Sequence, residues 1–480
     1  MYRLIINICA KASLIMGIMM LIPAICDLYA GDKHWMIFFR CFVLIVMISC
    51  LLLVATKDEK WKFSIKFGFL LTIYLWFLGI FIGALPFYFS HLHLSFSASI
   101  FEATSTITTT GSTVLRGLDN LPPGILVWRS LLCWLGGVGV MGLTLLLLPN
   151  LRNDGVQFFN MEDSYKNEKL LPRVNQVISS IVVIYFTITL LCMFTYFFAG
   201  MNLFDAINHA MTTVATSGVS THDASFAYFN SKSLLLVSGF FMVLGSLPIT
   251  FYLKLTTIGF RKSVKDLQII TFLTIIVISI SIITWYLKVK LHLGLKDAFY
   301  AAYFNFISLI STSGYTCEDY SLWGPLPVAL LLGAGLIGGC SGSTAGGIKI
   351  NRLIMLWQIT KAHLNKLISP HSIAKCRYGA IEISSDVALS VLLFVCLYLI
   401  TIIVGFIALM CTGLDLVSSF TGAIGALSNI GLGLGDKIGP AGNYATLSNT
   451  ELWIFSIIMI AGRLEIITLI IVLLPDFWKK

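Results

Sequence analysis

The segment SFSASIFEATSTITTTGS, residues 95–112, joins a short apolar stretch to a Thr-Thr-Gly-Ser tetrad. A helix needs about 20 residues to cross a bilayer, so this stretch is too short to span one. It predicts a helix that enters the membrane and turns back, which is tolerated where the backbone is buried in protein or lines water. The tetrad supplies a glycine, which adopts unusual backbone angles at low cost, and small hydroxyl side chains.

The same arrangement occurs four times in the chain, and each copy lies between two long apolar runs. The short segments are Ser95–Thr108, Leu203–Val214, Lys296–Ile310 and Leu416–Ser428. The tetrads that follow them are Thr109-Thr110-Gly111-Ser112, Thr216-Ser217-Gly218-Val219, Thr312-Ser313-Gly314-Tyr315 and Asn429-Ile430-Gly431-Leu432. Nine positions before the glycines stand Glu102, His209, Asn305 and Gly422. This pattern predicts four pseudo-symmetric span–pore-helix–span repeats around one pore.

The composition indicates a membrane protein. The 480 residues are 57% hydrophobic and 11% charged, with a mean hydropathy of +0.90, whereas soluble chains carry about 25% charged residues. Ten runs are long enough to span a bilayer. They are Ala12–Ala30, Trp35–Thr56, Phe67–Ser90, Gly124–Leu148, Val177–Gly200, Ser233–Leu253, Ile269–Leu287, Pro325–Ile348, Val387–Cys411 and Leu452–Leu474. We therefore predict an all-α polytopic membrane protein, and we exclude a soluble enzyme and a secreted disulfide module.

The predicted organisation is two N-terminal transmembrane helices (1–66) followed by four pore repeats (67–173, 174–266, 267–384 and 385–480). Most of the 32 basic residues fall in loops on the side of the N-terminus, so the positive-inside rule predicts both termini in the cytoplasm. This bias explains the net charge of +9 without nucleic acid as a partner. The first apolar run resembles a signal peptide, but Asp27 interrupts it, so we expect a retained helix.

The tetrads suit cation coordination. A ring of backbone carbonyls can replace the hydration shell of an ion, and hard oxygen ligands without thiolates favour an alkali cation over a transition metal. We therefore expect ions to pass residues 109–111, 216–218, 312–314 and 429–431. The alternative is that each tetrad is only a close helix-packing site. Each tetrad is followed by an outer loop with an acid, and these acids either concentrate cations at the pore mouth or are simply solvated: Asp119, Asp223, Asp319 and Asp436.

The second span of the third repeat is rich in glycine. Seven of the fifteen residues from 333 to 347 are glycine, and each interior glycine costs a helix about 1 kcal/mol. This composition predicts a broken helix whose middle, residues 338–347, crosses the pore as a gate. The candidate gate residues in it are Gly338, Gly339, Ser341, Gly342, Gly346 and Gly347. The alternative is a close contact between two helices.

Two cations within apolar runs accompany this segment. Arg463 lies within the last span and Lys349 lies at the end of the glycine-rich one. Charge at this depth faces a cavity or a partner, so the pair sets a barrier below the carbonyls or holds the gate. A structural ion pair is the other interpretation, although Glu465, two residues from Arg463, does not face it on a helix.

Two motifs point to other functions. Residues 137–142 spell G-x-G-x-x-G but lie inside an apolar span, so we reject a dinucleotide site. Residues 339–342 spell G-x-S-G, which would make Ser341 the nucleophile of an intramembrane serine protease with His209 or His363 as base. A secondary transporter with inverted repeats is a third class. Neither of these alternatives explains four repeats in one orientation.

The chain resembles the Trk/Ktr/HKT superfamily of potassium transporters, and within it the bacterial Trk-type proteins. The resemblance covers essentially the whole chain and is carried by four segments: residues 107–111 (ITTTG), 220–225 (STHDAS), 338–347 (GGCSGSTAGG) and 462–466 (GRLEI). The two extra N-terminal spans also match the Trk branch.

The resemblance implies more than the residues alone. It implies that one filter glycine per repeat (Gly111, Gly218, Gly314 and Gly431) lines a potassium path, and that the loop 338–347 gates it with Arg463. It further implies a homodimer in the inner membrane of a bacterial cell, bound to a cytosolic ring of nucleotide-binding regulatory subunits of the TrkA type. Potassium would be cargo, and no organic cofactor or enzymatic step is expected. Passive conduction and proton- or sodium-coupled symport both stay open.

Overall fold

The computed structural model describes residues 2–56, 65–147, 174–370, 376–379, 381–440 and 442–479. This part of the chain is almost entirely helical, which confirms the predicted fold class. Its one pair of strands, β1 (Arg377–Tyr378) and β2 (Ile381–Glu382), is two residues long and antiparallel. Several of the predicted cytoplasmic basic residues, including those between residues 148 and 173, lie outside the described residues.

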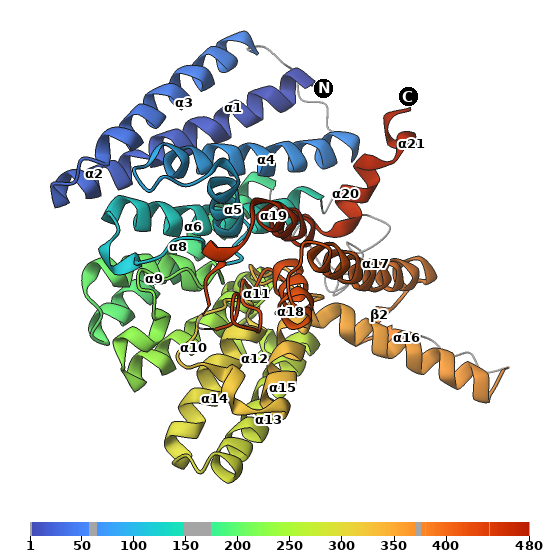
Figure 1. Ribbon diagram of the computed structural model, residues 1–480. Coiled ribbons are helices and arrows are strands. Elements are labelled where there is room, and N and C mark those ends of the chain that lie inside the picture. The colour runs from blue at the N-terminus through green and yellow to red at the C-terminus, as the bar shows by residue number, and fades with distance from the viewer. Residues whose placement is uncertain are drawn as a thin grey trace.

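The N-terminal helices lie along one side of the bundle (Figure 1). They are α1 (Tyr2–Met19), α2 (Leu21–Ala30) and α3 (Trp35–Ala55). The first helix therefore begins before the predicted span at Ala12, because hydropathy cannot show where a helix leaves the bilayer. Asp27 is fully buried, and its Oδ1 accepts a hydrogen bond from the Gly124 N–H at 2.5 Å. Its carboxylate thereby caps the helix that begins at Pro123 and ties the N-terminal helices to the rest of the bundle.

The remaining helices form four units, here called quarters, each with a short helix between longer ones. The first quarter contains α4 (Ile65–Phe89), α5 (Phe96–Ile107) and α6 (Pro123–Leu147); the second contains α8 (Val174–Phe198), α9 (Leu203–Val214), α10 (Lys232–Ser246), α11 (Ile249–Ile258) and α12 (Phe260–Ser263). The third contains α13 (Leu267–Lys290), α14 (Leu295–Ile310), α15 (Pro325–Ile337) and α16 (Ile350–Ile368); the fourth contains α17 (Ser385–Met410), α18 (Leu416–Leu427), α19 (Asn449–Arg463), α20 (Ile466–Leu473) and α21 (Pro475–Trp478). The outer loop of each quarter carries a 3-10 turn: Leu118–Asn120, Ser225–Phe229, Tyr320–Trp323 and Tyr444–Thr446.

The short helices α5, α9, α14 and α18 match the predicted re-entrant segments closely at both ends. Three of them begin at a capping side chain that accepts a backbone N–H: Ser95 from Ala98 at 3.2 Å, Asn202 from Asp205 at 2.7 Å and Asp415 from Ser418 at 2.9 Å. The bond from Ser418 also lowers the pKa of the Asp415 carboxyl. Such a cap contributes about 1 kcal/mol to helix stability.

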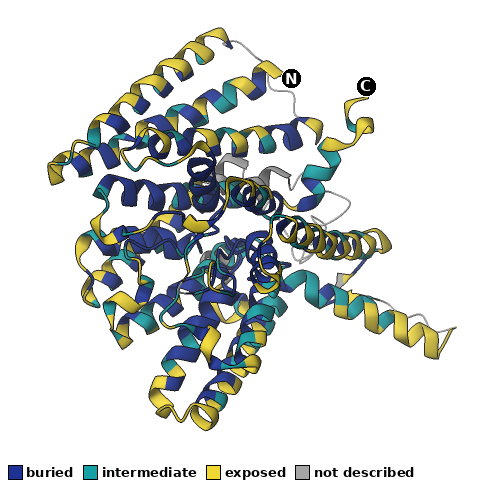
Figure 2. Cartoon of the chain, in the orientation of Figure 1, coloured by how far each residue is buried: buried dark blue, intermediate teal, exposed yellow. Residues whose placement is uncertain are grey.

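The four quarters close on themselves. Each short helix packs against the long helices of its own quarter and against the second long helix of the quarter before it: α5 against α19, α9 against α6, α14 against α10 and α18 against α15. The short helices are consequently buried at the centre, while exposed residues lie on the outer helices (Figure 2). This arrangement brings the four tetrads to one place.

Two predicted continuous spans are wrong, because each is sharply bent. In the described residues seven helices are long and apolar enough to cross a membrane, or nine if each bent pair counts as one span. The segment predicted as Ser233–Leu253 turns by 92° between α10 and α11, where Pro248 forces Leu247 into an extended conformation with ψ 150°. The segment predicted as Leu452–Leu474 turns by 102° between α19 and α20, where Glu465 has φ +53°.

The glycine-rich segment of the third quarter leaves the helix as its composition predicts. The helix α15 ends at Ile337 and α16 begins at Ile350. Between them Gly338, Gly342, Gly347 and Lys349 have positive φ angles of 74–80°, which an α-helix does not allow. The helix α16 then projects from the bundle (Figure 1).

Candidate functional site

The four tetrads share one backbone conformation. Each short helix is followed by a residue in the left-handed region: Thr109, Thr216, Thr312 and Asn429, with φ between +51° and +56°. Two residues later the glycine also has positive φ: Gly111 at +92°, Gly218 at +72°, Gly314 at +79° and Gly431 at +79°. Left-handed Thr is uncommon and costs energy, so three such residues, with Asn429 at the fourth equivalent place, point to a functional requirement for this geometry.

The four glycines form a closed ring, here called the glycine ring. A methyl group on each glycine would collide with the carbonyl oxygen of the residue before the glycine in the next quarter. The distances would be 2.1 Å from Gly111 to Ser217 O, 1.9 Å from Gly218 to Ser313 O, 2.1 Å from Gly314 to Ile430 O and 2.3 Å from Gly431 to Thr110 O. Each glycine therefore lies directly against its neighbour's carbonyl, and the fourth contact returns to the first quarter.

A backbone hydrogen bond fixes the second residue of each tetrad, the one before the glycine. Its N–H donates to a carbonyl five residues earlier, within the short helix: Thr110 to Ser105 at 2.8 Å, Ser217 to Thr212 at 2.9 Å, Ser313 to Ser308 at 2.8 Å and Ile430 to Gly425 at 2.8 Å. Most tetrad hydroxyls are already bonded, as Thr110 is to Thr108 at 2.8 Å and Ser313 to Ser311 at 2.9 Å, whereas Thr109 Oγ1 has no partner among the described residues. Backbone carbonyls, more than hydroxyls, are thus the oxygens that this arrangement can offer to a cation.

The glycine-rich loop, residues 338–347, packs against the ends of three short helices. The Gly346 N–H donates to Thr312 Oγ1 at 2.7 Å, and a methyl group on Gly346 would lie 2.0 Å from Ser428 O. The Thr344 hydroxyl bonds to Thr216 Oγ1 at 3.1 Å and to Val214 O at 3.2 Å. The loop therefore contacts the second, third and fourth quarters at the inner edge of the glycine ring.

Gly339, one of the candidate gate residues, has different surroundings from Gly346. It is not among the residues with positive φ. A methyl group on Gly339 would lie 2.6 Å from Ala345 Cβ and 3.2 Å from Ser246 Cβ, and no tetrad atom is as near. Its carbonyl accepts the Ile350 N–H at 3.0 Å. Gly339 therefore allows the loop to pack on itself and on α10, and it does not itself face the glycine ring.

The bend between α10 and α11 also holds this loop. The Cys340 N–H donates to Ser246 O at 3.1 Å, and the Ile249 N–H donates to Gly342 O at 2.9 Å. In a straight helix the Ser246 carbonyl and the Ile249 N–H would bond within the helix instead of to the loop. Sequence reasoning missed this site, although the Ser-Leu-Pro run at 246–248 carried the signal.

Two cations bind carbonyls of the loop. Lys349 Nζ donates to Ala345 O, and Arg463 Nη1 donates to Thr344 O at 2.8 Å. Among the described residues Arg463 has no salt bridge, and its Nε and Nη2 have no hydrogen-bond partner. Glu465 instead pairs with Arg352 at 2.8 Å. These contacts favour the interpretation that Arg463 holds the loop in place over the interpretation that it forms a structural ion pair.

The predicted outer acids have different surroundings. Asp119 binds His222 Nδ1, whose Nε2 lies 3.0 Å from Asp205, and Asp223 accepts the Leu118 N–H at 3.0 Å. Asp319 caps its own 3-10 turn through Ser321, and Asp436 is exposed. The first two acids therefore link outer loops in addition to adding negative charge.

The structure does not favour the two competing motifs. Ser341, considered as a nucleophile, donates no hydroxyl hydrogen bond to a histidine among the described residues; its backbone N–H donates to Gln268 Oε1. His209 Nε2 instead lies 3.1 Å from Ser220 Oγ. Gly137 belongs to α6 and lies against Tyr185, as expected for helix packing.

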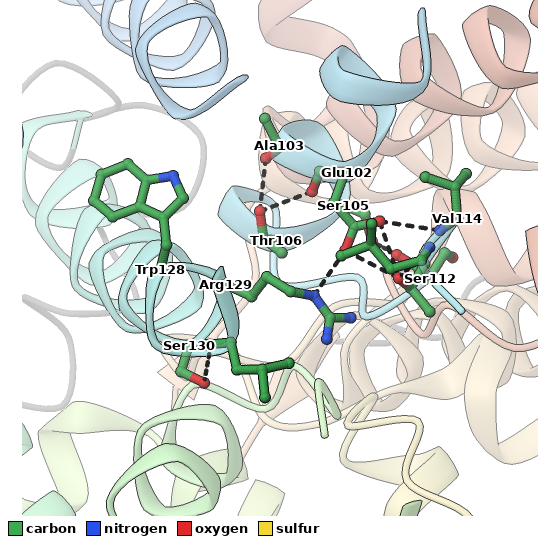
Figure 3. Close-up of polar contacts among 12 residues, drawn as sticks. Glu102, Ala103, Ser105, Thr106, Ser112, Val114, Trp128, Arg129 and Ser130 are labelled. Atoms are coloured by element: carbon green, nitrogen blue, oxygen red, sulfur yellow. Dashed lines mark hydrogen bonds and ion pairs between the residues drawn. The ribbon is translucent and has the colours of Figure 1, made fainter. Parts of the chain in front are cut away.

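A buried ion pair behind the first tetrad was not anticipated. The sequence singles out Glu102 only by its spacing from Gly111, and nothing in it singles out Arg129. Their side chains meet at 2.8 Å with 0% and 1% exposure (Figure 3). A carboxylate within a buried apolar helix was the available signal, because such a group needs a partner.

Known proteins match the chain over its length. The family model TrkH, described as a cation transport protein, matches residues 34–480. The Trk system potassium uptake protein TrkH of Escherichia coli (strain K12) is 31% identical, and the match covers 100% of both chains. TrkI of Halomonas elongata is 31% identical over 99% of this chain and 97% of the relative. The crystal structure of the potassium transporter TrkH from Vibrio parahaemolyticus superposes with a TM-score of 0.92 and 30% identity, covering 100% of both chains.

Proposed function

The chain belongs to the TrkH family of cation transport proteins, and from that premise we propose that it takes up potassium through the glycine ring. It is a multi-pass membrane transport protein and not an enzyme. Its relatives are named for potassium uptake, which makes K⁺ the proposed cargo. The single observation that carries the proposal is the closed contact of four glycines with four carbonyls.

The physical basis is the replacement of water by fixed oxygens. A potassium ion that enters from the outer mouth loses part of its hydration shell, and the carbonyls of Thr110, Ser217, Ser313 and Ile430 replace it. Each short helix also directs the negative end of its dipole at the ring. A membrane potential that is negative inside contributes about 2.3 kcal/mol per charge per 100 mV. This is enough to drive accumulation of K⁺ in the cell without covalent chemistry.

The loop 338–347 is the proposed gate. Its contacts with Thr216, Thr312 and Ser428 put it across the inner edge of the ring, so an ion leaves only when these contacts break. Lys349 and Arg463 stabilise the blocking position by donating to loop carbonyls, and their charge opposes cation passage.

The wider assembly follows as part of the same proposal. The protein would be a homodimer in the bacterial inner membrane, with both termini in the cytoplasm and a TrkA-type nucleotide-binding ring as its regulator. In this proposal, binding of the regulator favours the open position of the loop. Coupled symport with protons or sodium is the second candidate, and its signature would be K⁺ uptake that stops without the second ion's gradient.

The deciding experiment is ion uptake into proteoliposomes that hold the purified protein, first with a K⁺ gradient and then with a Na⁺ gradient. Gly314→Ser places an atom against Ile430 O and should abolish uptake. Gly333→Ser is the matched control, because a methyl group there meets nothing within 4 Å. Uptake that survives Gly314→Ser would contradict the proposal; absence of uptake by the unaltered protein would require a repeat with the regulatory subunit and nucleotide.

A further inference from the structure

We propose that Glu102 and Arg129 are positioning residues that set the ability of the glycine ring to discriminate between potassium and sodium. They act by holding the outer turn of the first tetrad against that of the second. This inference rests on the proposed function, since it concerns the same ring.

The carboxylate of Glu102 binds the chain just beyond the first tetrad. It accepts the Val114 N–H at 3.0 Å and the Thr113 hydroxyl at 3.0 Å. Arg129 Nε, which projects from α6 toward α5, pairs with it at 2.8 Å (Figure 3). Because both side chains are almost fully buried, the bonds act in a medium of low dielectric constant, where they are strong and costly to leave unmade.

Arg129 extends this connection to the second quarter. Its Nη1 donates to Ser220 O at 3.1 Å, and Ser220 lies two residues beyond Gly218. One buried ion pair therefore links the backbones that follow two of the four ring glycines. A rigid fork of donors is what the guanidinium offers and a lysine does not.

The residues equivalent to Glu102 in the second and third quarters also contact the chain beyond their tetrads, but through neutral and weaker hydrogen bonds. His209 Nε2 meets Ser220 Oγ at 3.1 Å, and Asn305 Nδ2 meets Cys317 Sγ at 3.2 Å, while Asn305 Oδ1 has no partner among the described residues. Gly422 has no side chain to contribute. In the fourth quarter the neighbouring Thr421 Oγ1 instead accepts the Leu434 N–H at 2.8 Å. The support behind the ring thus falls from an ion pair in the first quarter to a neutral hydroxyl in the fourth.

This gradient bears on ion choice because sodium is smaller than potassium. A carbonyl ring that is free to contract can coordinate the smaller ion, whereas a ring held apart favours the larger one. The two quarters tied by Glu102 and Arg129 are the least free to contract. Loosening them should admit sodium without abolishing potassium passage.

The test measures the ratio of K⁺ to Na⁺ uptake by the full-length protein in proteoliposomes, with its regulatory subunit if uptake requires one. Glu102→Gln should lower the ratio by about tenfold, a change of about 1.4 kcal/mol. The double variant Glu102→Gln with Arg129→Met removes both buried charges and so leaves neither of them unpaired. The K⁺ to Na⁺ ratio can then be measured on it if Glu102→Gln alone does not fold. Thr113→Val removes one donor to Glu102 without any change in charge and should lower the ratio to a smaller extent.

Two controls separate this role from general destabilisation. Asn305→Ala alters the equivalent position of the third quarter and should change the ratio less than Glu102→Gln. Lys232→Gln breaks an exposed ion pair with Asp297 and should leave the ratio unchanged.

A ratio that stays constant in folded Thr113→Val and in the double variant would overturn the inference, and so would an equal loss of K⁺ and Na⁺ uptake. Failure of the proposed function would be seen separately, as K⁺ uptake that survives Gly314→Ser.

Discussion

The hydroxyl of Thr344 is one of the groups that hold the loop 338–347 in place. Thr344 is 1% exposed, and its Oγ1 donates toward Val214 O and Gly245 O at 3.2 and 3.1 Å while it accepts from Thr216. No charge is involved, so this residue separates the geometry of the closed loop from the electrostatic barrier made by Lys349 and Arg463.

We expect Thr344→Val to raise basal K⁺ uptake. Valine keeps the volume but loses the hydroxyl, whose single proton is shared between two carbonyls and whose hydrogen bonding contributes about 1.5 kcal/mol in total. Because about 1.4 kcal/mol is a factor of ten, uptake without the regulator should rise by about tenfold, measured as initial flux into proteoliposomes. The matched control is Thr274→Val on the exposed face of α13, where the hydroxyl bonds only to its own helix. A flux no higher than that of the control would contradict gating by this loop.

Asp27 gives a second prediction at the residue scale, on stability. Its carboxylate caps α6 from α2, and loss of a capping side chain costs about 1 kcal/mol. Asp27→Ala should therefore lower the midpoint of thermal unfolding in detergent, and Asp27→Asn, which keeps an acceptor oxygen, should lower it less. Equal effects of the two substitutions would show that the cap is not what stabilises the junction.

At the scale of elements, the breaks in the helices are where the sequence was least informative. The short helices were predicted closely, because length and apolar content determine whether a segment can cross a bilayer. The bend at Pro248 was missed, because hydropathy counts apolar residues and takes no account of chain direction. The bend at Glu465 was also missed; there the Glu465 carboxylate pairs with Arg352, and only the folded chain brings the two residues together. Composition alone cannot tell a glycine that frees the backbone, as Gly338 does, from one that makes room for a neighbour, as Gly339 does.

The bend at Pro248 should affect K⁺ uptake through the loop 338–347, to which its backbone groups bond. Pro248→Ala restores an N–H, so α10 can continue and Ser246 O and Ile249 N can bond within the helix instead of to the loop. We expect higher basal K⁺ uptake. In a double-mutant cycle with Thr344→Val the two effects should fall short of additive, because both release the same loop. Strict additivity would mean that the bend and Thr344 act independently.

At the scale of the whole molecule, four quarters of one chain close the ring. The fourfold repeat and the ring glycines could be predicted from the sequence, because glycine and small hydroxyl residues recur at equivalent places. Which carbonyl each glycine contacts could not, since the partners belong to different quarters, as Gly431 and Thr110 do, and depend on the order of quarters around the axis. The ion pair of Glu102 with Arg129 was missed for a similar reason: its residues belong to different helices.

A ring within one chain predicts how mixtures behave. If unaltered and Gly314→Ser chains are co-expressed and reconstituted together, K⁺ uptake should fall in proportion to the fraction of altered chains, whether or not the protein is a dimer. In a pore built between chains, the remaining uptake would instead follow a higher power of the fraction of unaltered chains, so it would fall more steeply. Flux measured across a series of mixing ratios, with the Gly333→Ser chain as the diluting control, distinguishes the two.

Fusion of the four quarters also affects how the protein can change over generations. In a pore made from four identical chains, one codon change alters every subunit at once, so a residue that is harmful at any position is lost. Here each quarter is encoded separately, and a mutation reaches one side of the pore alone. Asn429-Ile430 in the fourth quarter and Glu102 in the first are differences that an identical tetramer could not hold. Ion preference can therefore be adjusted by selection in single small steps.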